Sequence, residues 1–115
     1  ITVAEVEQLL DDPRIRYLSE MMNFPGILNG DATCLAKVKA AQKRGKPVDG
    51  HAPGLRGEQA ARYVAAGITT DHECFTKEEA LDKLAAGCKI AIREGSAWKF
   101  EKRKVDEWVA SGRIK

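Results

Sequence analysis

The chain has 115 residues, of which 43% are hydrophobic and 31% are charged, and its formal net charge is +2 at pH 7. This composition is typical of one small globular domain and argues against a disordered segment. The net charge gives no reason to expect a nucleic-acid or membrane partner, and no apolar run approaches the ~20 residues that cross a bilayer. The first residues lack the charged and apolar regions of a signal peptide, so we expect none.

The first segment predicts a helix followed by a strand. Thr2 and Glu5 form a capping box ahead of apolar residues at helical spacing, and this helix should end near Asp11. Residues 15–19 then predict a strand that leads into Glu20.

Further along, short apolar runs alternate with segments of helical spacing. We expect a loop at 21–26, helices at 32–43, 56–66 and 77–86, and strands at 47–50, 68–71 and 88–92. Alternation of this kind is typical of parallel strands joined by helical crossovers. The chain therefore predicts an α/β fold with a parallel sheet of about four strands.

Polar side chains follow the predicted strands: Glu20, His51, His72 and the pair Arg93 and Glu94. Because the carboxyl ends of parallel strands meet at one edge of a sheet, these side chains can converge. A histidine there is either a metal ligand or acid/base, or a polar residue hydrogen-bonded in a tight turn. One carboxylate and two imidazoles could hold a metal and leave a position open for water, as a hydrolytic site requires.

Three cysteines occur, Cys34, Cys74 and Cys88, and no pair has the CxxC spacing. This pattern argues against a disulfide framework or a structural zinc site, so we expect a reducing, cytoplasmic location. Cys74 follows the second histidine closely and either approaches the site or is a small buried residue.

Four motifs occur in one order: EMMNFPG at 20–26, VDGHAPG at 48–54, AGITTDHE at 66–73 and IREGSA at 92–97. Together they resemble adenine deaminases of the amidohydrolase superfamily, and the resemblance covers about residues 1–97 as an internal segment of such an enzyme. It implies a fold that is part of a TIM (β/α)8 barrel.

The resemblance also implies a chemistry. In those enzymes the glutamate that matches Glu20 bridges two metals, and the histidines that match His51 and His72 bind one of them. A hydroxide attacks the adenine ring carbon that carries the amino group, which gives hypoxanthine and ammonia. The family's metals are manganese, iron or zinc, and ligand type alone does not choose among them.

Other residues near the strand ends have two interpretations each. Arg93, Glu94 and Ser96 either line the purine pocket or form an exposed turn. Glu73 either supports a metal ligand through a hydrogen bond or faces solvent at the start of a helix, and Asp49 is a second candidate for such support.

Two parts of the family's site have no counterpart here. The chain has only two histidines, far apart, so the first-strand His-x-His pair is absent, and the aspartate of the last barrel strand cannot be placed. A full barrel takes ~250 residues, whereas this chain offers about four βα units. We expect a catalyst that is incomplete alone, and an unclosed barrel that forms homo-oligomers or binds the missing portion. The alternative is a non-catalytic remnant of the fold or a recombined scaffold.

The resemblance ends after residue 97, so we divide the chain into a partial barrel domain at 1–97 and a basic, aromatic tail at 98–115. Residues 98–112 resemble the wing and last helix of excisionase-type winged-helix DNA binders. Basic residues beside aromatic ones can contact phosphates. The other interpretation is a terminal helix that covers apolar surface. The sequence leaves open whether the junction is a fusion, a frameshift or a recombination.

Overall fold

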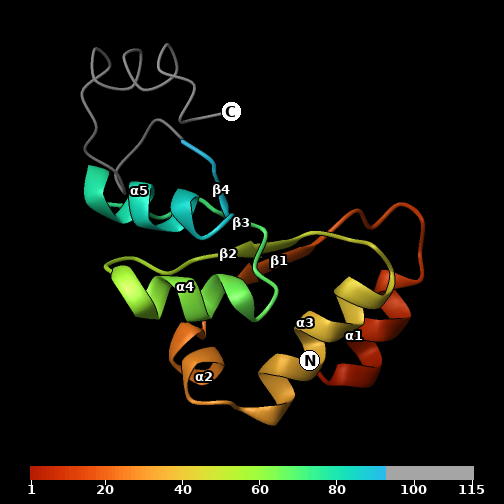
Figure 1. Cartoon of the computed structure of the whole chain (residues 1–115). Helices are drawn as coiled ribbons and strands as arrows, with labels where there is room; N and C mark the ends of the chain where they lie inside the picture. Colours follow the sequence, from red (N-terminus) through yellow and green to blue (C-terminus); the bar gives the residue numbers. More distant parts are fainter. Residues whose placement is uncertain (93–115) are drawn as a thin grey trace.

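The computed structural model describes residues 1–92 of the chain (Figure 1). Along the sequence, its elements are α1 (Val3–Leu10), β1 (Leu18–Met21), α2 (Phe24–Leu28), α3 (Ala32–Lys43), β2 (Val48–Gly50), α4 (Gly57–Ala65), β3 (Thr70–Asp71), α5 (Lys77–Ala85) and β4 (Lys89–Ile90). The strands are all parallel and lie in the order β1-β2-β3-β4. The predicted α/β fold is thus confirmed, and it is consistent with part of a TIM barrel.

Side-chain caps set where several helices begin. The Oγ1 of Thr2 accepts a hydrogen bond from the backbone N–H of Glu5 at 3.1 Å, and the Oγ1 of Thr76 accepts one from Glu79 at 3.2 Å. Each bond satisfies a backbone donor that has no partner within its helix. The predicted starts of α1 and α5 are confirmed.

Several boundaries differ from the prediction, and the expected strands at 68–71 and 88–92 are shorter in the structure, as β3 and β4. Helix α2 begins within the expected loop, because the Asn23 side chain accepts from the Gly26 N–H at 3.0 Å and Pro25 occupies the first turn, where no donor is needed. Strand β1 begins at Leu18 and not at residue 15, since the Ile15 N–H is bonded back to Asp12 in a turn. Glu20 therefore lies within β1.

The helices pack against one another in pairs. Helix α1 contacts α3, α2 contacts α4, and α4 contacts α5 (Figure 1). The main core lies beneath β1 and β2, and its fully buried members are Val38, Ala41, Val48, Ala52, Ala60 and Tyr63. A smaller cluster of Cys74, Ala80 and Ile90 lies beside β4. This packing holds the strand ends, and the residues that follow them, in fixed relative positions.

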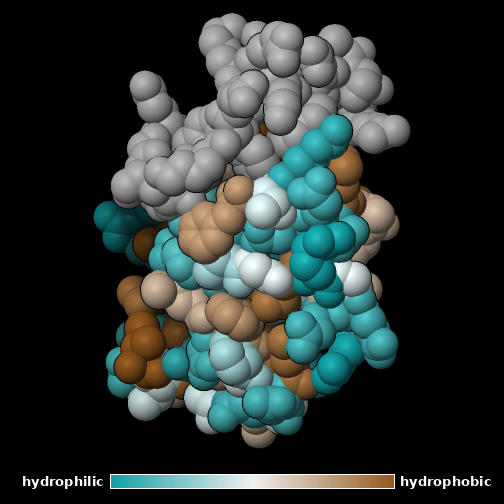
Figure 2. Space-filling view, turned by 90° about the vertical axis from the view of Figure 1, so that its left-hand side faces the viewer, coloured by the Kyte–Doolittle hydropathy of each residue, from teal (hydrophilic) through white to brown (hydrophobic). Residues whose placement is uncertain are grey.

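Apolar side chains also reach the surface. Figure 2 shows brown patches between hydrophilic ones on one face of the described residues. Exposed large apolar residues include Leu9, Ile15, Tyr17, Met22 and Phe75. Among residues 1–92, no helix has the length and apolar character needed to cross a membrane. The tail at 98–115, and with it the predicted DNA-binding resemblance, lies outside the described residues.

Candidate metal centre

Three side chains from three neighbouring strands or strand ends converge. Nδ1 of His51 lies 3.3 Å from Nε2 of His72, which in turn lies 3.2 Å from Oε2 of Glu20. Oε1 of Glu20 is 3.6 Å from Nδ1 of His51. One donor atom from each residue therefore lies within 4.8 Å of the other two. Parallel pairing of β1, β2 and β3 produces this convergence from residues far apart in the chain.

The chemistry and spacing of these donors fit a divalent cation. Zinc bonds of about 2.0–2.1 Å in a tetrahedron separate neighbouring ligands by about 3.3 Å. The observed separations of 3.2, 3.3 and 3.6 Å are close to that value. Glu20 is more exposed than the two half-buried histidines, so the cluster can be reached from solvent. Nitrogen and carboxylate donors of this kind suit several first-row metals.

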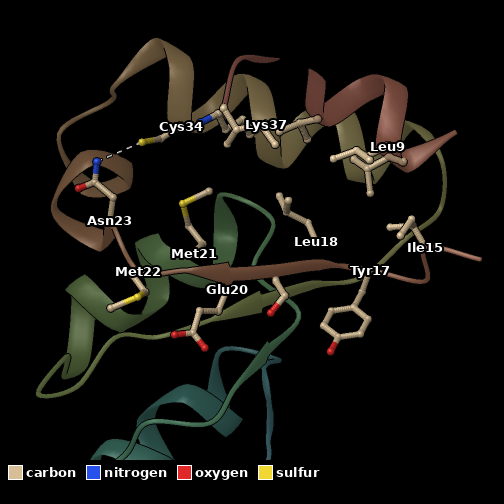
Figure 3. A pocket seen from close by; sticks show the side chains of 14 residues that line it. Leu9, Ile15, Tyr17, Leu18, Glu20, Met21, Met22, Asn23, Cys34 and Lys37 are labelled. Atoms are coloured by element: carbon tan, nitrogen blue, oxygen red, sulfur yellow. Dashed lines mark hydrogen bonds between the residues drawn. The ribbon is translucent and has the colours of Figure 1, made fainter. Parts of the chain in front are cut away.

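A bulge in β1 aims Glu20 at the histidines. Leu18 pairs with Val48 and Met21 pairs with Gly50, so three steps along β1 match two along β2. An extra residue of this kind reverses the side-chain alternation of a strand. Figure 3 shows Leu18 and Met21 pointing toward α1 and α3, whereas Glu20 points away from them.

Asp49 contacts the ring nitrogen of His72 that points away from the cluster. Its Oδ2 lies 3.0 Å from Nδ1 of His72, and its Oδ1 accepts a hydrogen bond from the Thr70 hydroxyl at 2.7 Å. A proton held on Nδ1 by the carboxylate leaves Nε2 of His72 as the lone-pair donor. That nitrogen is the one that faces Glu20 and His51.

Tyr63 fixes the backbone at His51 and was not singled out from the sequence. Its hydroxyl donates to the Met21 carbonyl at 2.7 Å and accepts from the His51 N–H at 3.2 Å. Burial raises the pKa of Tyr63 well above its usual range, so the hydroxyl keeps its proton. Gly50 makes room for this ring, because a Cβ there would lie 2.7 Å from the Tyr63 oxygen.

A buried ion pair lies next to the histidine turns. Nζ of Lys83 is 3.2 Å from Oδ2 of Asp71, and the two side chains are 0% and 1% exposed. Sequence reasoning missed both residues as parts of the site. The available signal was the position of Lys83 on the apolar side of α5, three residues after Ala80.

The remaining predicted site residues have different outcomes. Glu73 is 4% exposed, with Oε2 3.9 Å from Nδ1 of His51, and α5 begins only at Lys77. The interpretation of Glu73 as a solvent-facing residue at a helix start is therefore wrong. Cys74 is buried, and burial raises its pKa to about 11, which confirms it as a small buried residue. The three predicted substrate-binding residues lie outside the described residues: Arg93, Glu94 and Ser96.

Fold and site define a parallel α/β protein with a candidate metal centre at the carboxyl ends of its strands. No protein-family model matches the chain. It is 60% identical over 95 residues to the adenine deaminase of Sulfurovum sp. (strain NBC37-1), a match over 83% of this chain and 18% of that protein. The adenine deaminase of Salinibacter ruber is 64% identical over 94 residues, 82% of this chain and 17% of that protein.

The adenine deaminase of Methanosarcina mazei is 52% identical over 97 residues, which are 84% of this chain and 18% of that protein. The chain is thus homologous to a segment of adenine deaminases, and the resemblance predicted from the four motifs is confirmed. It spans less than a fifth of the length of the curated relatives that it matches.

Proposed function

We propose that the chain is part of an adenine deaminase and that Glu20, His51 and His72 are its contribution to the metal centre. The observation that supports this most is the convergence of the three donors within 4.8 Å from β1 and the ends of β2 and β3. The proposed reaction is hydrolysis of adenine to hypoxanthine and ammonia. The relatives' name supports adenine as the substrate.

A divalent ion held by this set would lower the pKa of a water molecule and so supply a nucleophile near neutral pH. The chain's own residues prepare for that chemistry. Glu20 contributes negative charge toward the cation, and Asp49 keeps Nε2 of His72 free by binding Nδ1 at 3.0 Å. Tyr63 holds the main chain at His51, which sets where the His51 ring can lie.

We further propose that the chain does not catalyse the reaction alone. It has two histidines in all, and both belong to the cluster. The relatives are more than five times as long as the matched segment. Additional ligands and a proton-transfer group would come from the portion of such an enzyme that this chain does not match.

The test is a titration of the purified chain with Mn²⁺, Fe²⁺ and Zn²⁺, compared with the variants Glu20→Gln and His51→Ala. We expect about one ion per wild-type chain and at least a tenfold loss of affinity in each variant. Glu58→Gln removes an exposed carboxylate from α4 and is the matched control. Wild-type binding no tighter than that of both variants would overturn the proposed metal centre.

A separate assay addresses catalysis. Ammonia release from adenine is measured for the metal-loaded chain, and we expect none above a chain-free blank. Turnover that disappears in His51→Ala would show that the chain is a complete catalyst, and the proposal of dependence on other portions would then be wrong.

A further inference from the structure

We propose that Asp71 and Lys83 form a buried clamp that fixes the two candidate ligand histidines relative to each other. Both are positioning residues, because the described contacts of Asp71 and Lys83 are with main chain and Cys74 and not with the ligand rings. The inference extends the proposed function, and the metal-binding part of its test rests on that function.

The clamp makes hydrogen bonds to both backbone groups of Ala52, the residue after His51. The N–H of Ala52 donates to Oδ2 of Asp71 at 3.1 Å, and its carbonyl accepts from Nζ of Lys83 at 2.7 Å. Ala52 is fully buried, so these bonds are made away from competing water. Ala52, the residue that follows His51, is therefore held by the ion pair through the peptide groups on both of its sides.

The same ion pair also makes hydrogen bonds to both backbone groups of Glu73, the residue after His72. The N–H of Glu73 donates to Oδ1 of Asp71 at 2.7 Å, and its carbonyl accepts from Nζ of Lys83 at 3.4 Å. One carboxylate and one ammonium thus bind two turns that lie 21 residues apart in sequence. A shift of either turn would break bonds to the ion pair.

The chemistry of the pair favours a geometric role over a general contribution to stability. A buried ion pair gains little over apolar residues of the same volume, because removing two charges from water costs as much as their attraction returns. Here the remaining hydrogen-bonding capacity goes to Ala52 and Glu73, and Lys83 also lies 3.5 Å from Sγ of Cys74. The pair therefore specifies where the strand-end turns lie.

The experiment compares the full chain with the double variant Asp71→Asn/Lys83→Met, which removes both charges at nearly constant volume. Affinity and visible absorption of bound Co²⁺ report the metal centre. In the metal-free protein, nuclear Overhauser effects between the His51 and His72 rings report their separation, since the ring centroids lie 5.3 Å apart. The variant Asp11→Asn/Arg44→Met removes an ion pair between the residues that directly follow α1 and α3, and it is the control.

We expect the double variant to stay folded by circular dichroism, to bind Co²⁺ about 10- to 100-fold more weakly, and to lose the ring-to-ring effects. The control should match the wild type in both readouts. A folded double variant with wild-type Co²⁺ affinity would overturn the clamp. If Asp71→Asn/Lys83→Met does not fold, Asp71→Asn/Lys83→Gln is measured by the same criteria, because it keeps polar groups at both positions.

The two proposals fail in different ways. A wild-type chain that binds no Co²⁺ overturns the metal centre, and the ring-to-ring effects then decide the clamp alone. If the ring-to-ring effects persist in the folded double variant, the clamp is overturned. If these effects are lost in the double variant but kept in the control, the clamp is supported.

Discussion

His51 and His72 turn ring nitrogens toward each other across 3.3 Å, although 21 residues separate them in the chain. Two lone pairs at this distance repel, so either a proton or a cation must lie between the nitrogens. Asp49 favours the proton of His72 on Nδ1, which leaves Nε2 as an acceptor. A cation bound between the rings would accept lone pairs from both nitrogens and from Glu20, whose Oε2 lies 3.2 Å from Nε2 of His72.

Asp49→Asn should weaken metal binding about 10- to 100-fold without unfolding the chain. The amide keeps the volume of the carboxylate but loses the charge that holds the proton on Nδ1 of His72. Isothermal titration with Zn²⁺ measures the affinity, and Glu58→Gln is the exposed control. Affinity equal to that of the wild type would show that Asp49 does not support the ligand.

Much of the site follows from the pattern of the sequence. Apolar runs that stop at His51 and His72 predict two strand ends, and parallel pairing brings such ends to one edge of a sheet. Asp49, a candidate for supporting a metal ligand, lies beside His72 because it is on β2 next to β3. These predictions need only local periodicity and the rule that crossovers keep strands parallel.

The rest depends on tertiary contacts that no local pattern encodes. The bulge that aims Glu20 arises from pairing between β1 and β2, and the sequence of β1 does not mark it. Lys83 occupies a helix position that amphipathic spacing assigns to the core, where an ammonium is stable only beside Asp71. Such partners are visible only when distant segments are brought together.

Tyr63→Phe should lower the free energy of unfolding by about 1–3 kcal/mol, because it leaves the Met21 carbonyl and the His51 N–H without a buried partner. Urea unfolding followed by circular dichroism measures the change. Tyr17→Phe is the matched control, since that ring is 50% exposed, and we expect a change within about 0.5 kcal/mol. Equal effects of the two substitutions would contradict the role given to the Tyr63 hydroxyl.

Cysteine reactivity should separate Cys34 from the other two thiols. Burial raises the pKa of Cys74 to about 11 and that of Cys88 to about 12, so about one Cys74 in a thousand is a thiolate at pH 8. A disulfide reagent should label half-buried Cys34 first and the others only after unfolding, and Cys34→Ser should remove the fast phase. Simultaneous labelling of three thiols in the folded chain would contradict this.

The same shifts predict how stability changes in alkali. Because the folded pKa values of Cys74 and Cys88 lie above the ordinary value of 9.0, the folded state binds these protons more tightly than the unfolded state. Their contribution is complete below about pH 9 and is lost as pH rises toward about 12. Urea midpoints measured across this window should fall, and less steeply in Cys88→Ala.

The chain should self-associate through the surface at β1. Among the described strands β1 lies at an edge of the sheet, and a pocket beside it is lined by Leu9, Ile15, Tyr17 and Met22 (Figure 3). Light scattering after size exclusion should show a mass that rises with concentration. Tyr17→Ser/Met22→Ser should reduce it, and Phe75→Ser, also exposed, should not. A monomer at all concentrations would contradict the prediction.

The most direct test of the central claim is X-ray absorption spectroscopy of the zinc-loaded chain. If Glu20, His51 and His72 bind one ion together, the spectrum should show nitrogen and oxygen ligands at about 2.0–2.1 Å with the scattering of two imidazoles. His51→Ala should reduce that scattering to one imidazole. A zinc shell of oxygen alone in the wild type, or a spectrum that His51→Ala leaves unchanged, would contradict the claim.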